Sequence, residues 1–214
     1  MSEPDITLRD PWPLLRWTRA ILQIQIVVNA CLVAFSVGVI ALKRDPYIID
    51  PHQIQLLAMA ISYVQLANVV SLVIGAILGA LLTYRTMKNV HALRGAGARV
   101  TPLWSVLWYI VPIANVVMPP KAVSQIWDGT FGDSVQAKQR GKLIWWWWIA
   151  IVASIILHQI ALRATLSSGP MTPSVGDILH PLSYALAAIS ALFFIRVFTL
   201  IARAQNIQSS RNAA

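Results

Sequence analysis

Two histidines at the ends of apolar stretches are the side chains best suited to chemistry in this sequence. His158 and His180 lie near the ends of two such stretches, and Asp177 stands about one turn before His180. Two facing imidazoles could hold a transition metal or a haem. No ligand spacing such as C-x-x-C or H-x-x-x-H accompanies them, which favours ordinary interfacial histidines. We therefore predict no metal and no other cofactor.

Acidic side chains are missing from the long apolar stretches. All eight Asp and Glu residues lie in the tails and in the loops between those stretches. Carboxylates inside membrane spans usually mark proton or cation pathways. Their absence argues against cation-coupled transport and against an intramembrane aspartyl protease. The sequence also lacks H-E-x-x-H, G-x-S-x-G and P-loop motifs, so we predict a protein that is not an enzyme.

A few other residues in the apolar stretches suggest contacts with lipid or with another helix. Arg196 is the one charge inside a predicted span, and a side chain that reaches back to the membrane surface explains it. A contact to an anion or a lipid headgroup is the alternative for Arg196. Gly75 and Gly79 form a G-x-x-x-G motif, which permits close helix approach and offers a face for self-association.

The elements that must position these residues follow from the composition. Apolar residues make up 57% of the 214 residues and charged residues 12%, against about 45–50% and about 25% in soluble domains. This balance excludes a disordered chain and argues against a soluble domain. A membrane span needs about 20 mostly apolar residues. Four stretches meet that requirement and are predicted to be transmembrane helices: residues 20–42, 54–84, 143–162 and 182–201.

A fifth apolar stretch, Leu103–Met118, is short and rich in proline. Pro112 lies in its middle and Pro119-Pro120 follow it. Because proline removes a backbone donor and clashes with the preceding turn, we expect a break at Pro112. The stretch is either a short fifth crossing or a re-entrant hairpin over about residues 102–127. In a hairpin, Asn115 is placed to bond the backbone groups freed at the tip.

The distribution of Lys and Arg favours the hairpin. Basic residues of short loops gather on the cytoplasmic side of a membrane. Five crossings divide those in the tails and loops into eight and eight, whereas four crossings divide them into thirteen and three. All nine Trp, including Trp145–Trp148, then fall on the side with thirteen. Because topology accounts for the basic residues, we predict no nucleic-acid binding.

The resulting prediction is an all-α integral membrane protein with both termini in the cytoplasm. Four transmembrane helices accompany a proline-broken re-entrant hairpin on the cytoplasmic side, and five crossings remain the alternative. Residues 1–19 form a cytoplasmic N-terminal segment. Residues 20–203 form a single membrane domain, and residues 204–214 form a cytoplasmic tail.

The segment Tyr84–Trp127 carries a recognisable pattern. It has an aromatic-Arg start, an Asn and a Leu, a Pro before Trp-rich sequence, V-P-x-x-N, a further Pro and a terminal Trp. This pattern resembles a bacterial multi-pass membrane family called domain of unknown function 4328. The resemblance implies a multi-pass bacterial protein, which we place in the plasma membrane, and it brings no activity. The matching positions are Tyr84, Arg85, Asn89, Leu93, Pro102, Trp104, Trp108, Pro112, Asn115, Pro119 and Trp127.

These observations support three hypotheses about function. The first is a non-enzymatic scaffold or partner-binding protein whose working surface is the segment 85–142. The second is a small channel or transporter that uses the broken helix around Pro112–Asn115. The third is an enzyme that works through His158 and His180. The expected partners are the lipid bilayer and other membrane proteins or a second copy of the chain.

Overall fold

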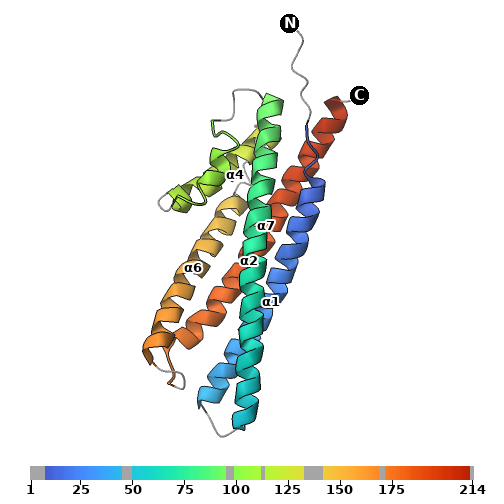
Figure 1. Cartoon of the computed structure of the whole chain (residues 1–214). Helices are drawn as coiled ribbons and strands as arrows, with labels where there is room; N and C mark the ends of the chain where they lie inside the picture. The colour runs from blue at the N-terminus through green and yellow to red at the C-terminus, as the bar shows by residue number, and fades with distance from the viewer. Residues whose placement is uncertain are drawn as a thin grey trace. The chain divides into compact units, whose positions relative to one another are not determined.

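The computed structural model describes residues 8–44, 50–94, 99–111, 114–132, 142–168 and 172–212, and the regular structure in these ranges is all helical. Two short helices lie between the second and third long helices along the chain (Figure 1). The long helices are α1 (Trp12–Arg44), α2 (Pro51–Arg94), α6 (Lys142–Ser168) and α7 (Val175–Asn212), and the short ones are α3 (Trp104–Leu107) and α4 (Ala114–Phe131).

The four predicted spans are confirmed as helices long and apolar enough to cross a membrane. Each helix also continues past the apolar stretch that predicted it. With 44 residues, α2 is about 66 Å long, roughly twice the thickness of a hydrocarbon core. It runs through Tyr84 to Arg94, and α7 runs through Ile201 to Asn212. The loss of apolar character therefore marks the end of a stretch suited to lipid and not the end of the helix.

The chain divides into two compact units. The first comprises Met1–Ala20, Gly75–Trp148 and Phe193–Ala214, and the second comprises Ile21–Ile74 and Ile149–Leu192. Each of the four long helices contributes one part to each unit. Both short helices, α3 and α4, belong to the first unit.

The first unit holds most of the large, fully buried side chains. Of the twelve that rank largest, only Leu32 belongs to the second unit. In the second unit, side chains such as Tyr63, Leu66 and Ile155 are more than half exposed. This pattern is typical of helices whose apolar faces meet lipid, while the first unit has the buried core of a folded domain.

Close packing on α2 fixes the position of α4 in the first unit (Figure 1). A Cβ added at Gly129 of α4 would lie 2.3 Å from Cγ1 of Val90 on α2, so only glycine fits there. The helix ends at Phe131, and the φ of 65° at the following Gly132 is the left-handed conformation common after helix C-termini. The Gly132 N–H donates to the Asp128 carbonyl at 2.8 Å.

The stretch Leu103–Met118 does not form one continuous helix. The short helix α3 ends at Leu107, and α4 begins at Ala114. Pro112, the predicted break, lies outside the described residues. Thr101 closes the turn before α3, because the Trp104 N–H donates to Thr101 Oγ1 at 3.4 Å. In the ranges that the structure describes, neither α3 nor α4 meets the length and hydropathy expected of a span.

Candidate functional site

Asn89 joins the N-terminal segment to two helices of the first unit. Its side chain is 4% exposed and lies on α2. Asn89 Oδ1 accepts the Arg9 backbone N–H at 3.2 Å, and Asn89 Nδ2 donates to the Arg9 carbonyl at 2.9 Å. Nδ2 also donates to Gln205 Oε1 on α7 at 3.0 Å. One amide group thus holds the chain before α1 against α2 and α7.

Gln205 extends this network to α4. Its Nε2 donates to the Thr86 carbonyl at 3.2 Å and to Thr130 Oγ1 at 3.1 Å. Gln208 Nε2, one turn later, donates to the Thr130 carbonyl at 2.8 Å. We call Asn89, Gln205, Thr86, Thr130 and the Arg9 backbone the amide hub. Because its buried members are hydrogen-bonded to one another, the hub specifies one arrangement of α2, α4 and α7.

Asn89 was predicted as a motif residue, whereas Gln205 was not. Gln205 lies in the part of α7 that continues past the predicted span. The helical spacing of Phe194, Phe198, Ile201 and Gln205 places all four on one face, and all four are buried. Extending that spacing beyond Ile201 is the signal that would have found Gln205.

A tryptophan replaces one of the backbone donors that the prolines remove from α4. In an α-helix the Val116 carbonyl would accept the N–H of residue 120, but Pro120 has none. Trp148 Nε1 donates to that carbonyl at 2.7 Å. Asn115 was expected to bond the freed backbone groups, yet its side chain makes no hydrogen bond to any described residue. The indole of α6 thus bonds a carbonyl inside α4, whereas the break at Pro112, where Asn115 was expected to act, lies outside the described residues.

The tryptophan run Trp145–Trp148 divides between core and surface. Trp147 and Trp148 are buried, whereas Trp145 and Trp146 are 44% and 58% exposed. The Trp147 ring packs edge-on against Phe194 of α7, with 5.3 Å between ring centroids. Four adjacent residues point all round a helix, so the run does not form a single-faced surface.

The remaining motif residues have three kinds of environment. Trp104 and Trp108 share one side of the α3 segment, as predicted from their spacing, with ring centroids 6.3 Å apart. Pro119 is buried and Pro102 is half-buried. Ser105 Oγ donates a hydrogen bond to the Pro102 carbonyl. Trp127, the terminal Trp of the motif, is 1% exposed in the core of the first unit.

The two candidate histidines come together in the second unit. The ring centroids of His158 and His180 are 5.4 Å apart, and Tyr184 stacks on His180. His180 Nε2 lies 3.4 Å from Thr165 Oγ1, and its Nδ1 is buried without a hydrogen bond among the described residues. Within these ranges, no three His, Cys, Asp or Glu side chains are grouped to hold a metal.

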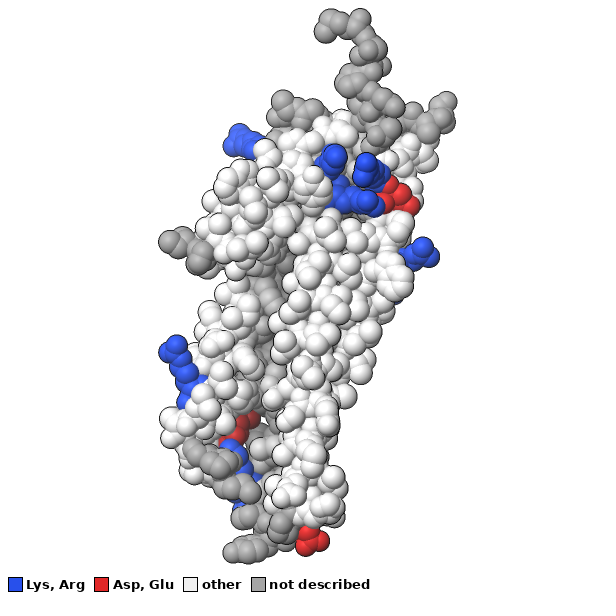
Figure 2. Space-filling view, viewed as in Figure 1, with Lys and Arg blue, Asp and Glu red and all other residues white. Residues whose placement is uncertain are grey.

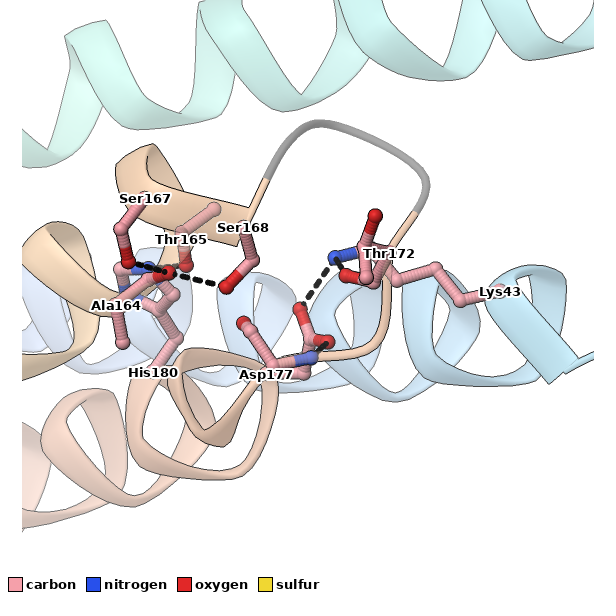
Figure 3. Close-up of polar contacts among 9 residues, drawn as sticks. Lys43, Ala164, Thr165, Ser167, Ser168, Thr172, Asp177 and His180 are labelled. Atoms are coloured by element: carbon pink, nitrogen blue, oxygen red, sulfur yellow. Dashed lines mark hydrogen bonds and ion pairs between the residues drawn. The ribbon is translucent and has the colours of Figure 1, made fainter.

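Asp177 bonds Lys43 and the Ser174 backbone, and it does not bond His180 (Figure 3). Its Oδ1 accepts Lys43 Nζ of α1 at 2.8 Å, and its Oδ2 accepts the Ser174 N–H at 2.8 Å. Lys43 also donates to the Thr172 carbonyl at 3.2 Å. This arrangement ties α1 to the start of α7. It does not form the carboxylate–imidazole pair that would orient His180 as a base.

Arg196 is exposed, whereas the two glycines of the G-x-x-x-G motif are buried. Arg196 is exposed, although its neighbours on α7 Phe194 and Phe198 are buried. Its exposure is compatible with a side chain that reaches back to the membrane surface and with the alternative, a contact to an anion or a lipid headgroup. Gly79 lies against Phe194, whose Cζ would be 3.3 Å from an added Cβ. Gly75 is buried as well, so this glycine face is covered inside the chain.

Four long apolar helices, with exposed apolar faces in one unit and a buried core in the other, define a helical multi-pass membrane protein. The chain belongs to the family described as Domain of unknown function (DUF4328), whose family model matches residues 46–203. The match extends well beyond the segment Tyr84–Trp127 that carried the resemblance. Comparison with curated proteins gave no match, and comparison with solved structures gave none either.

Proposed function

We propose that this protein is a non-enzymatic scaffold of the bacterial plasma membrane that presents its α3–α4 segment to another membrane protein. The observation that carries the proposal is a set of exposed apolar side chains on a firmly held support. We infer further that this segment is a re-entrant hairpin on the cytoplasmic side. The buried support and the exposed side chains belong to the same stretch of chain.

The support is the buried face of α4. Val123, Ile126 and Trp127 are at most 1% exposed, and Pro119 and Pro120 are buried with them. The bond from Trp148 and the contact of Gly129 with α2 hold the same helix at two further points. A segment fixed in this way can offer a partner a preformed surface, which reduces the entropy lost on binding.

The exposed side chains lie on both sides of the break between α3 and α4. Ile110 is 76% exposed, which is unusual for an isoleucine in contact with water. An apolar surface of this kind meets lipid or another protein. Its exposed members are Leu103, Trp104, Ile110, Val111 and Val116, which we call the apolar rim.

The charge distribution supports a cytoplasmic position for this segment. The chain segments of the first unit contain 14 of the 17 Lys and Arg residues and all nine Trp. Both tails and the α3–α4 segment belong to that unit. A bias of this size is what the positive-inside rule associates with the cytoplasmic face.

A small channel or transporter is the alternative, and the interruption between Leu107 and Ala114 is the feature that favours it. Ion sites in broken helices use backbone carbonyls that the break has freed. The Val116 carbonyl, which Pro120 frees inside α4 and not at this interruption, already accepts a hydrogen bond from Trp148. Flux into liposomes that Asn115→Leu abolishes would favour the channel over the scaffold.

Reporter fusions test the proposed topology. Fusions after residue 133 and at the C-terminus should report the cytoplasm, and a fusion after residue 169 should report the outside. The reason is that an even number of crossings separates the first two positions, whereas one crossing separates each of them from residue 169. An alkaline phosphatase and a fluorescent-protein reporter at each position give opposite readouts. An external residue 133 would rule out a re-entrant hairpin on the cytoplasmic side.

Site-specific photo-crosslinking tests the scaffold role. A photoreactive residue at Ile110 should give a discrete protein adduct in native membranes, because the apolar rim is the proposed contact. The matched control is Val37 of α1, which is 57% exposed in the second unit and should give lipid adducts only. Mass spectrometry of the adducts provides the readout. Lipid adducts alone at residue 110 would contradict partner binding.

A further inference from the structure

A pocket of about 360 Å³ in the first unit lies between the chain that leads into α1 and one face of α2. Arg9, Arg85 and Lys88 give it three cationic groups, while Leu14 and Leu81 give it an apolar side. No acidic side chain is among the described residues that line it. In Figure 2, basic side chains gather on one part of the face shown, while most of that face carries no charge.

Along α2, the residues that line the pocket change from apolar to basic. Leu81, Arg85 and Lys88 are three to four residues apart, so they share one helix face. Leu81 belongs to the uncharged stretch 54–84, whereas Arg85 and Lys88 come directly after it. Tyr84, also in the lining, stands where the apolar stretch gives way to charge. The pocket is thus apolar toward the membrane span and cationic beyond it.

The cationic side of the pocket is held in place by the backbone before α1. Asn89 fixes both backbone groups of Arg9 through the amide hub. Arg85 Nη1 donates to the Asp10 carbonyl at 3.3 Å. The Asp10 carboxylate accepts the Trp12 N–H at 2.9 Å, as a cap of α1. Arg9 and Arg85 are therefore brought together before any ligand arrives.

We propose that this pocket binds a phosphate group, and that its occupant is an anionic phospholipid with its phosphate at Arg9, Arg85 and Lys88 and its acyl chains along Leu14 and Leu81. Guanidinium groups form strong, directional hydrogen bonds with phosphate oxygens. Basic pockets at the membrane surface recognise anionic headgroups in this way. Free phosphate would use the cations but would leave the apolar side unused, so the lining favours the lipid.

Lipid binding to the full-length protein tests the proposal. Protein in phosphatidylcholine nanodiscs is titrated with phosphatidylglycerol, and native mass spectrometry counts the bound lipids. Arg85→Gln/Lys88→Gln should weaken binding about 30-fold, since each basic residue near a membrane surface contributes about fivefold. The control Arg16→Gln/Arg19→Gln removes the same charge from exposed positions of α1 outside the pocket and should leave binding unchanged. Equal weakening by both pairs would overturn the proposal.

Two further arms separate the lipid from free phosphate and from misfolding. Leu81→Ser should weaken lipid binding and leave the binding of inorganic phosphate unchanged. Binding of inorganic phosphate as tight as that of the lipid would overturn the lipid assignment. Lys88→Gln alone, at an exposed position, should preserve the thermal unfolding midpoint and still lower lipid affinity about fivefold. An unchanged lipid affinity in this variant would count against the pocket.

Discussion

Replacing Asn89 with leucine should lower the free energy of unfolding by about 3 kcal/mol, because each hydrogen-bonding group left without a partner in a buried site costs about 1–3 kcal/mol. The change removes the partner of the Arg9 N–H, the Arg9 carbonyl and Gln205 Oε1. The two Arg9 groups lie closer to solvent and should contribute least. Unfolding of the detergent-purified protein in increasing denaturant provides the measurement.

A double-mutant cycle shows whether this loss comes from the amide hub. Gln205→Leu should also destabilise the protein, and Asn89→Leu/Gln205→Leu should cost less than the sum of the single changes, because the two amides bond each other. The matched control is Asn206→Leu, since Asn206 is the exposed neighbour of Gln205 on α7. A loss from Asn89→Leu no larger than that from Asn206→Leu would contradict the hub.

Replacing Trp148 with phenylalanine should cost about 2 kcal/mol, because the Val116 carbonyl then loses its donor. Part of this loss reflects the smaller ring, so a second change is needed to isolate the hydrogen bond. Pro120→Ala restores a backbone N–H at the position that normally serves the Val116 carbonyl in a helix. In that background, Trp148→Phe should cost about 1 kcal/mol less than in the native chain.

The control for this pair lies two residues earlier in the same run. Trp146 is 58% exposed, so Trp146→Phe should change the unfolding free energy little in either background. Thermal and denaturant unfolding of the four combinations at positions 120 and 148 give the coupling energy directly. An equal cost of Trp148→Phe with and without Pro120 would show that the indole acts by packing alone.

The four long helices could be predicted because the bilayer imposes a length and a composition on every span. Each of the four apolar stretches lies inside one helix of the structure. The extension of α2 to Arg94 and of α7 to Asn212 was missed. Those residues are polar or charged on one side and pack on the other, so hydropathy alone does not reveal them. The helical spacing of the buried side chains does.

The contacts of the site were harder to predict, since most of them join residues far apart in sequence. Asn89 and Asn115 look alike as polar residues of one motif. Only the fold shows that Asn89 bonds the Arg9 backbone and that the Trp148 indole bonds the Val116 carbonyl. The sequence favoured two ordinary interfacial histidines, and the structure brings their ring centroids to 5.4 Å because both residues lie near the same turn between helices.

The amide hub and the Trp148 bond also determine the order in which parts of the new chain can pack during synthesis. The donor to the Val116 carbonyl lies 32 residues later in the sequence, and Gln205 lies 116 residues after Asn89, so the ribosome must add these residues before either bond can form. The first unit therefore closes only when the last turns of α7 have been made. Until then, α4 can contact α2 and α6 but lacks the hydrogen bonds that Gln205 and Gln208 of α7 donate to Thr130.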